Sequence, residues 1–245
     1  MINPDITAII ARQEQAMIAF RRDLHAHPEL PWEEKRTTDR VAAELEAIGI
    51  PYRRTHPTGI IADIIGGKPG KTVALRADMD ALPVRELNDP LDYKSQTPGK
   101  MHACGHDGHT TILLAAAKYI ASPACQFNGT VHLIFQPAEE AIGGADLMIK
   151  DGLFERFPCE RIFGLHNMPG LPVGKVGFYA GNFMASADTV KITITGYGGH
   201  GAHPERTVDP IVTGAALVMN LQSIVARNVP PGETAVVSVG TFQAG

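Results

Sequence analysis

Cysteine is scarce in this sequence, which contains three in 245 residues, an odd number that cannot pair completely within one chain. A chain of this length buries enough apolar surface to fold without disulfides, so we expect reduced thiols. A thiol redox function is disfavoured, because no second cysteine lies at CxxC spacing from Cys104. Cys125 and Cys159 lie near prolines in predicted loops and are interpreted as incidental.

An excess of positive charge is also absent, as is any long apolar run. The 22 Lys and Arg residues are outnumbered by 26 Asp and Glu, and the net charge of -4 disfavours nucleic acid and anionic membranes as partners. No apolar run approaches the roughly 18 residues of a spanning helix, and the N-terminus lacks a secretory signal pattern. We therefore expect a cytoplasmic, globular protein.

Hydrophobic periodicity predicts alternating helices and strands over the first part of the chain. Apolar residues at helical spacing predict helices at 4–24, 33–48, 107–120 and 144–150. Short apolar runs bounded by turn residues predict strands at 59–65, 72–77, 130–135 and 161–165. This alternation favours an α/β fold with a mostly parallel, helix-flanked sheet, which we expect to form a metal-binding catalytic domain of residues 1–185.

The pattern changes after Gly181. Residues 190–195 and 234–242 alternate apolar and polar side chains, which predicts strands with one solvated face, and a helix is expected at 208–229. We therefore expect residues 186–245 to form a second, smaller α+β domain. The sequence ends within this pattern, so the domain is expected to be incomplete.

Residues of metal-binding types follow three of the predicted strands and precede one predicted helix: Asp78, Asp80, Cys104, His106, Glu139, Glu140 and His166. Because ligands of open α/β sheets gather at the carboxyl ends of the strands, these side chains should meet at one sheet edge. Thiolate, imidazole and carboxylate together suit a divalent ion such as Zn, Mn, Co or Ni. The sequence therefore predicts a metal site at this edge.

Individual roles are less determined than the site itself. Adjacent Glu139 and Glu140 cannot face the same way in an extended backbone, so one carboxylate can bind metal while the other holds a water as general base. Asp80 fits an acceptor that orients a ligating histidine, although capping a turn is an equally ordinary role at a strand end. Taken singly, each of these residues has a structural explanation, and only their coincidence at one edge favours a metal site.

Five spaced strings carry a resemblance: LRADMDALP at 75–83, MHACGHDGHT at 101–110, FQPAEE at 135–140, GLHNMP at 164–169 and GGHGAHPERTVDPI at 198–211. In this order they resemble the metal-dependent aminoacylase and carboxypeptidase family. The similarity is to the branch with hippurate hydrolase, bacterial N-acyl-amino-acid amidohydrolases and the plant enzymes that hydrolyse auxin conjugates. It covers essentially the whole chain.

The resemblance implies specific roles. Two divalent metal ions would be ligated by Cys104, His106, Glu140 and His166. Glu139 would be the general base, and His200 would reach across a homodimer to the substrate carbonyl. His203 and Arg206 would hold the substrate carboxylate. The implied reaction hydrolyses the amide bond of an N-acyl amino acid, and the implied full chain is longer, with a completed ferredoxin-like lid and dimerisation domain and a further histidine ligand.

Two alternatives remain open at this stage. A metallo-carboxypeptidase or dipeptidase would use the same site on a peptide. The sequence contains no feature that distinguishes such an enzyme from an amidohydrolase. A truncated chain could instead be a non-catalytic, metal-binding and dimerising fragment.

Overall fold

The computed structural model describes residues 4–141, 143–181 and 184–244. Its contacts divide the chain into two compact units, Met1–Lys175 and Val176–Gly245. The helices and strands are, in chain order, α1 (Pro4–Ala26), α2 (Lys35–Ala47), β1 (Tyr52–Arg54), β2 (Ile60–Ile65), β3 (Thr72–Asp78), α3 (His106–Ile120), β4 (Thr130–Gln136), α4 (Gly144–Lys150), α5 (Leu153–Arg156), β5 (Arg161–Gly164), the 3-10 helix η1 (Pro204–Arg206) and α6 (Pro210–Asn228). Among the described residues, none of these helices is both long and apolar enough to cross a membrane. The domain boundary expected after residue 185 stays a prediction.

The first unit is built on a five-stranded sheet in the order β1-β2-β4-β3-β5. β3 pairs in parallel with both β4 and β5, whereas β2 is antiparallel to β1 and to β4. Four of the five strands therefore run in one direction, which confirms the predicted mostly parallel sheet. The eight predicted elements of this unit are all present close to their expected ranges, and the short β1 and α5 were not predicted.

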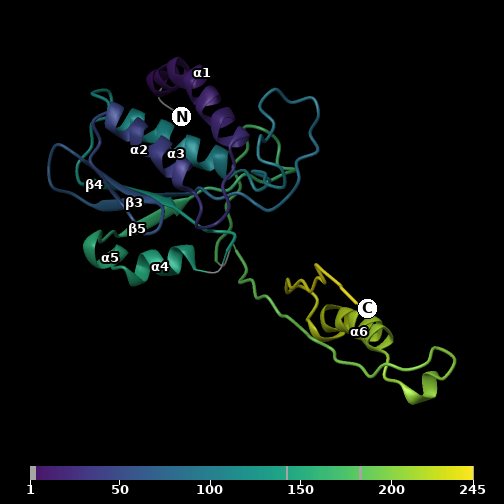
Figure 1. Cartoon of the computed structure of the whole chain (residues 1–245). Coiled ribbons are helices and arrows are strands. Elements are labelled where there is room, and N and C mark those ends of the chain that lie inside the picture. The colour runs from purple at the N-terminus through teal and green to yellow at the C-terminus, as the bar shows by residue number, and fades with distance from the viewer. Residues whose placement is uncertain (1–3, 142, 182–183, 245) are drawn as a thin grey trace. The chain divides into compact units, whose positions relative to one another are not determined.

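Helices cover both faces of this sheet. Figure 1 shows α1, α2 and α3 on one face and the shorter α4 and α5 on the other. The pleat of β4 explains both layers, because Val131, Leu133 and Phe135 belong to one buried cluster while Ile134 belongs to another. The three-layer arrangement is the one that alternating helices and strands predict.

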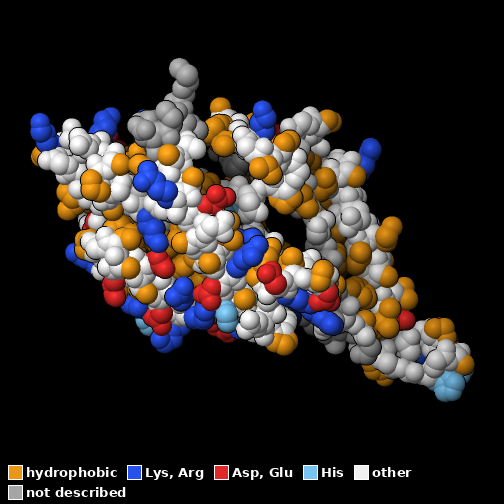
Figure 2. All heavy atoms as spheres, turned by 90° about the horizontal axis from the view of Figure 1, so that it is seen from above, with side chains coloured by type: hydrophobic (Ala, Val, Ile, Leu, Met, Phe, Trp, Pro, Cys, Tyr) orange, Lys and Arg blue, Asp and Glu red, His pale blue; other side chains and the backbone are white. Residues whose placement is uncertain are grey.

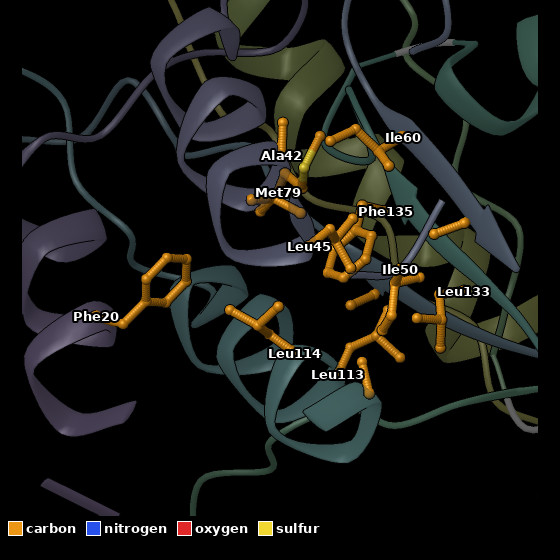
Figure 3. Close-up of a cluster of buried hydrophobic side chains, with 14 of the residues drawn as sticks. Phe20, Ala42, Leu45, Ile50, Ile60, Met79, Leu113, Leu114, Leu133 and Phe135 are labelled. Carbon is orange, nitrogen blue, oxygen red and sulfur yellow. The ribbon is translucent and has the colours of Figure 1, made fainter. Parts of the chain in front are cut away.

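The larger cluster anchors α3 against the sheet. Figure 3 shows Leu113 and Leu114 of α3 lying with Leu133 and Phe135 of β4, and Phe20 of α1 belongs to the same cluster. Leu114, Leu133 and Phe135 are completely buried. Full burial of such side chains contributes roughly 1.5–3 kcal/mol each. This packing holds the first turn of α3 at the edge where the parallel strands end.

The second unit contains one long helix, α6. Asp209 caps it by accepting hydrogen bonds from the N–H groups of Ile211 and Val212, and Pro210 takes the first helical position. The strands predicted at 190–195 and 234–242 are not formed, because the described residues of this unit contain only isolated bridges. Alternation supplies an apolar face, but a strand also needs a neighbour that pairs its backbone groups.

The surface carries charges of both signs. Figure 2 shows basic and acidic side chains interspersed over the face that it displays. This mixture is consistent with the small net charge of -4.

Candidate metal centre

The parallel strands bring the predicted ligands to one edge of the sheet. β3 ends at Asp78, β4 leads into the segment that carries Glu139 and Glu140, and β5 leads to His166. α3 begins there with His106. Three sets of side chains each place one possible ligand atom within 4.8 Å of one another: Cys104 with His106 and His166, His106 with Glu139 and Glu140, and Asp78 with His106 and His109. His106 is common to all three sets.

His106 is oriented by an aspartate. Its Nδ1 lies 3.3 Å from Asp80 Oδ1, which favours a proton on Nδ1 and leaves the lone pair on Nε2. Nε2 lies 3.7 Å from Asp78 Oδ2 and 3.9 Å from both Glu139 Oε2 and Glu140 Oε1. The ring is completely buried, and neither of its nitrogens has a hydrogen-bond partner among the described residues, although Nδ1 lies within ion-pair distance of Asp80. A buried nitrogen that faces carboxylates without a hydrogen bond fits a cation ligand.

The Cys104 thiol and His166 form the second half of the donor set. Cys104 Sγ lies 3.4 Å from His166 Nε2. His166 Nδ1 donates to the Asn167 carbonyl oxygen at 2.6 Å, so Nε2 again keeps its lone pair. Burial, together with the Glu140 carboxylate, raises the pKa of Cys104 to about 12. Without a cation the thiol therefore stays protonated at neutral pH, and a bound cation would favour the thiolate.

The two glutamates are presented by a backbone that Asp80 holds. The N–H of Glu139 donates to Asp80 Oδ1 at 3.0 Å, and the N–H of Glu140 donates to Asp80 Oδ2 at 2.9 Å. Burial and the adjacent Glu140 carboxylate raise the pKa of Glu139. A raised pKa makes the Glu139 carboxylate a stronger base, which suits a role in proton transfer.

His109 is close to the centre but is already occupied. His109 Nδ1 lies 2.7 Å from Asp78 Oδ1, and Nε2 lies 3.0 Å from the backbone nitrogen and 2.5 Å from the side-chain Oδ1 of Asn167, so both ring nitrogens already have partners. Asp78 also accepts from Arg76 Nη1 at 2.7 Å. These contacts, acting against burial, lower the pKa of Asp78 to about 2. His109, Asp78 and Arg76 therefore support the centre, and the sequence alone did not assign any of them this role.

Only some of these supporting contacts could have been predicted from the sequence. Arg76 and Asp78 are two residues apart on β3, so they lie on the same face and could have been paired. The contact between Asn167 and His109 could not be predicted in this way, because it joins the segment after β5 to α3 across the fold.

The substrate residues expected in the smaller domain lie in the second unit. His200, His203 and Arg206 are all exposed. His200 Nδ1 accepts from the N–H of Ala202 at 3.1 Å, and His203 Nδ1 lies 3.3 Å from Glu205 Oε1. The roles of these three residues stay predictions.

A helix-flanked sheet that gathers thiol, imidazole and carboxylate donors at its strand ends defines the class of metal-dependent hydrolases. The chain belongs to peptidase family M20/M25/M40, whose sequence model matches residues 74–241. Family membership thereby confirms the resemblance seen in the five motifs.

Three relatives show how far the similarity extends. The chain is 49% identical, over 92% of its length, to a hippurate hydrolase of Campylobacter jejuni. It is 42% identical, over 100% of its length, to an N-acyl-L-amino acid amidohydrolase of Geobacillus stearothermophilus. The crystal structure of Bacillus subtilis YXEP, described as a dinuclear metal binding peptidase from the M20 family, is 41% identical with a TM-score of 0.62 over 69% of this chain and 45% of that one. The matches cover 58% and 66% of the first two relatives, so this chain spans well short of their full length.

Proposed function

We propose that the chain carries the metal-binding part of an amidohydrolase that splits N-acyl amino acids, such as hippurate, into a carboxylic acid and a free amino acid. One observation carries the proposal: His106 Nε2 lies 3.9 Å from both Glu139 Oε2 and Glu140 Oε1, with the other donors beside it. The hippurate hydrolase and the amidohydrolase among its relatives support this substrate class.

Two divalent ions, of Zn, Mn, Co or Ni, would be held by Cys104, His106, Glu140 and His166. The dinuclear protein among the relatives supports the number, and the mixture of sulfur, nitrogen and oxygen donors supports the metal class. When bound, such ions supply Lewis acidity, which polarises an amide carbonyl and makes water more acidic.

The chain's own residues would move the proton. Glu139 accepts it from the attacking water at its carboxylate and then donates it to the leaving amine nitrogen. Asp80 keeps the proton of His106 on Nδ1, so that Nε2 stays a ligand. His200 stabilises the developing oxyanion from a second copy of the chain, and His203 and Arg206 bind the substrate carboxylate. A homodimer and a cytoplasmic location belong to this proposal.

The test is a substrate panel measured with the purified chain. Chelation followed by addition of each metal should restore hydrolysis of hippurate and N-acetyl amino acids, and dipeptides should be poorer substrates. Glu139→Gln should lower kcat by roughly a hundred- to ten-thousandfold while metal content is unchanged. Dipeptide hydrolysis alone would identify a peptidase, and metal binding with no hydrolysis of any substrate would identify a non-catalytic fragment.

A further inference from the structure

Two residues with side chains adopt left-handed backbone conformations in the described part of the chain. Trp32 has a φ of 69° and Ala138 a φ of 49°. Such conformations are uncommon outside glycine and persist only where neighbouring contacts hold them, often at functional sites. Ala138 directly precedes Glu139, and Trp32 lies two residues before Glu34. One left-handed residue is therefore next to Glu139, and the other is close in sequence to Glu34.

Glu34 makes that contact. Its side chain is completely buried, and Oε1 accepts a hydrogen bond from the N–H of Ala138 at 2.7 Å. Oε2 accepts from the Thr58 hydroxyl at 2.7 Å, which fixes the second oxygen. A buried carboxyl group with both oxygens engaged is held in one position. Its position in turn determines where the Ala138 amide can lie.

Three consecutive amides of the glutamate segment are thus bound by two buried carboxyl groups. Glu34 binds the N–H of Ala138, while Asp80 binds those of Glu139 and Glu140. The sequence predicted that Asp80 could orient a ligating histidine, but it predicted no role for Glu34. Without Glu34, the Ala138 N–H would be buried without an acceptor, and its φ could relax to the ordinary negative range. Such a change would turn the peptide that leads into Glu139.

We propose that Glu34 is a positioning residue of the metal centre, whose Oε1 holds Ala138 in its left-handed conformation so that Glu139 and Glu140 face His106 Nε2. The proposal rests on the metal site proposed above. Glu34 contacts no ligand atom, so its effect on the centre is transmitted entirely through the backbone. The oxygen acceptor is the required feature, and the negative charge is not.

A pair of substitutions separates position from charge. Glu34→Gln keeps the length and an acceptor oxygen but removes the charge, and the Thr58 hydroxyl can rotate to accept from the new amide nitrogen. Glu34→Asp keeps the carboxyl group but retracts it by one methylene. Glu29→Asp is a matched control, since the Glu29 carboxylate accepts the N–H groups of Arg36 and Thr37 at the start of α2 instead of the Ala138 amide.

The affinity for Co²⁺ is measured by titration of the metal-free chain, with the visible spectrum reporting the ligand set. Glu34→Asp should weaken binding by about 10- to 100-fold, as substitutions that misplace a metal ligand do. Glu34→Gln and Glu29→Asp should bind close to the unsubstituted chain. Normal Co²⁺ affinity in Glu34→Asp would overturn the proposal, and so would equal weakening in Glu34→Gln, because the charge would then be what matters.

Hydrogen exchange of the Ala138 amide, measured without metal, tests the same contact independently. Exchange should be faster in Glu34→Asp and unchanged in Glu29→Asp, and unchanged exchange in Glu34→Asp would overturn the proposal. If the unsubstituted chain bound no Co²⁺, the metal site itself would be wrong, while the exchange measurement would still decide whether Glu34 holds the segment.

Discussion

Asp80 faces His106 with one carboxylate oxygen, 3.3 Å from the ring Nδ1, and the same carboxylate accepts the N–H groups of the two glutamates that follow β4. One buried side chain therefore orients a histidine donor and also holds the segment that carries the carboxylate donors.

Asp80→Ala should weaken divalent metal binding by about 10- to 100-fold, because both His106 and the glutamate segment lose their orientation. The measurement is a metal titration of the chelated chain. Asp63→Ala is the matched control, since Asp63 also pairs with a histidine, His132, but on β2 and β4 away from the centre. Equal losses in the two variants would show that Asp80 has no specific role at the metal.

Metal affinity should rise with pH. Binding requires His106 Nε2 and the Cys104 sulfur without protons, and the pKa of each is raised in the chain without metal, that of Cys104 to about 12. The proton therefore competes with the cation, and this competition weakens as pH rises. Co²⁺ titrations at several pH values should show a steep gain, together with proton release on binding. Affinity that is independent of pH would contradict this ligand set.

Asp78 should make the metal-free chain sensitive to acid. Its pKa is lowered from 3.8 to about 2, so its contribution to stability is present above about pH 4 and is lost as pH falls through about 2. The shift corresponds to about 2 kcal/mol at neutral pH. Asp78→Asn should lose at least this amount at neutral pH in chemical denaturation, and the difference from the unsubstituted chain should shrink in acid. A constant difference across this range would show that the carboxylate charge is not the stabilising feature.

His25 should have the opposite pH dependence. Its Nδ1 lies 2.8 Å from Asp107 Oδ2 and its Nε2 3.2 Å from Glu86 Oε1. The hydrogen bond to Asp107, with the help of Glu86 and against burial, raises the pKa of His25. Its stabilising effect is therefore complete below about pH 6.5 and is lost as pH rises through the raised value.

His25→Gln is the variant that tests this. The loss in unfolding free energy should be largest below about pH 6.5 and should become smaller as pH rises through the raised pKa of His25. His27 offers a control on the same helix end, because its side chain is more exposed and its Nδ1 contacts the backbone oxygen of Asp23. A loss that grows with pH for His25→Gln would show that the imidazole is neutral in the folded chain.

Local patterns predicted the elements of the first unit and the helix α6 of the second, but the strands that they predicted in the second unit are not formed. Helices such as α3 and strands such as β3 could be predicted because one face of each is buried, which imposes a period of 3.6 or 2 on the apolar residues. Residues 190–195 show the same alternation as a strand, yet they form no ladder. Pairing requires a neighbouring strand in register, and alternation within one segment carries no information about that neighbour.

The sequence by itself determined the chemistry of the site: which thiol, imidazole and carboxylate groups follow the strands, and that parallel strand ends should bring them together. Only the tertiary structure decided that Asp80 faces Nδ1 of His106, that His109 is occupied by Asp78 and Asn167, and that Glu34 reaches the Ala138 amide across 104 positions of the chain. The reason is physical. Residue type limits what a group can bind, whereas its hydrogen-bond partners, which come from distant segments, determine the direction in which it binds.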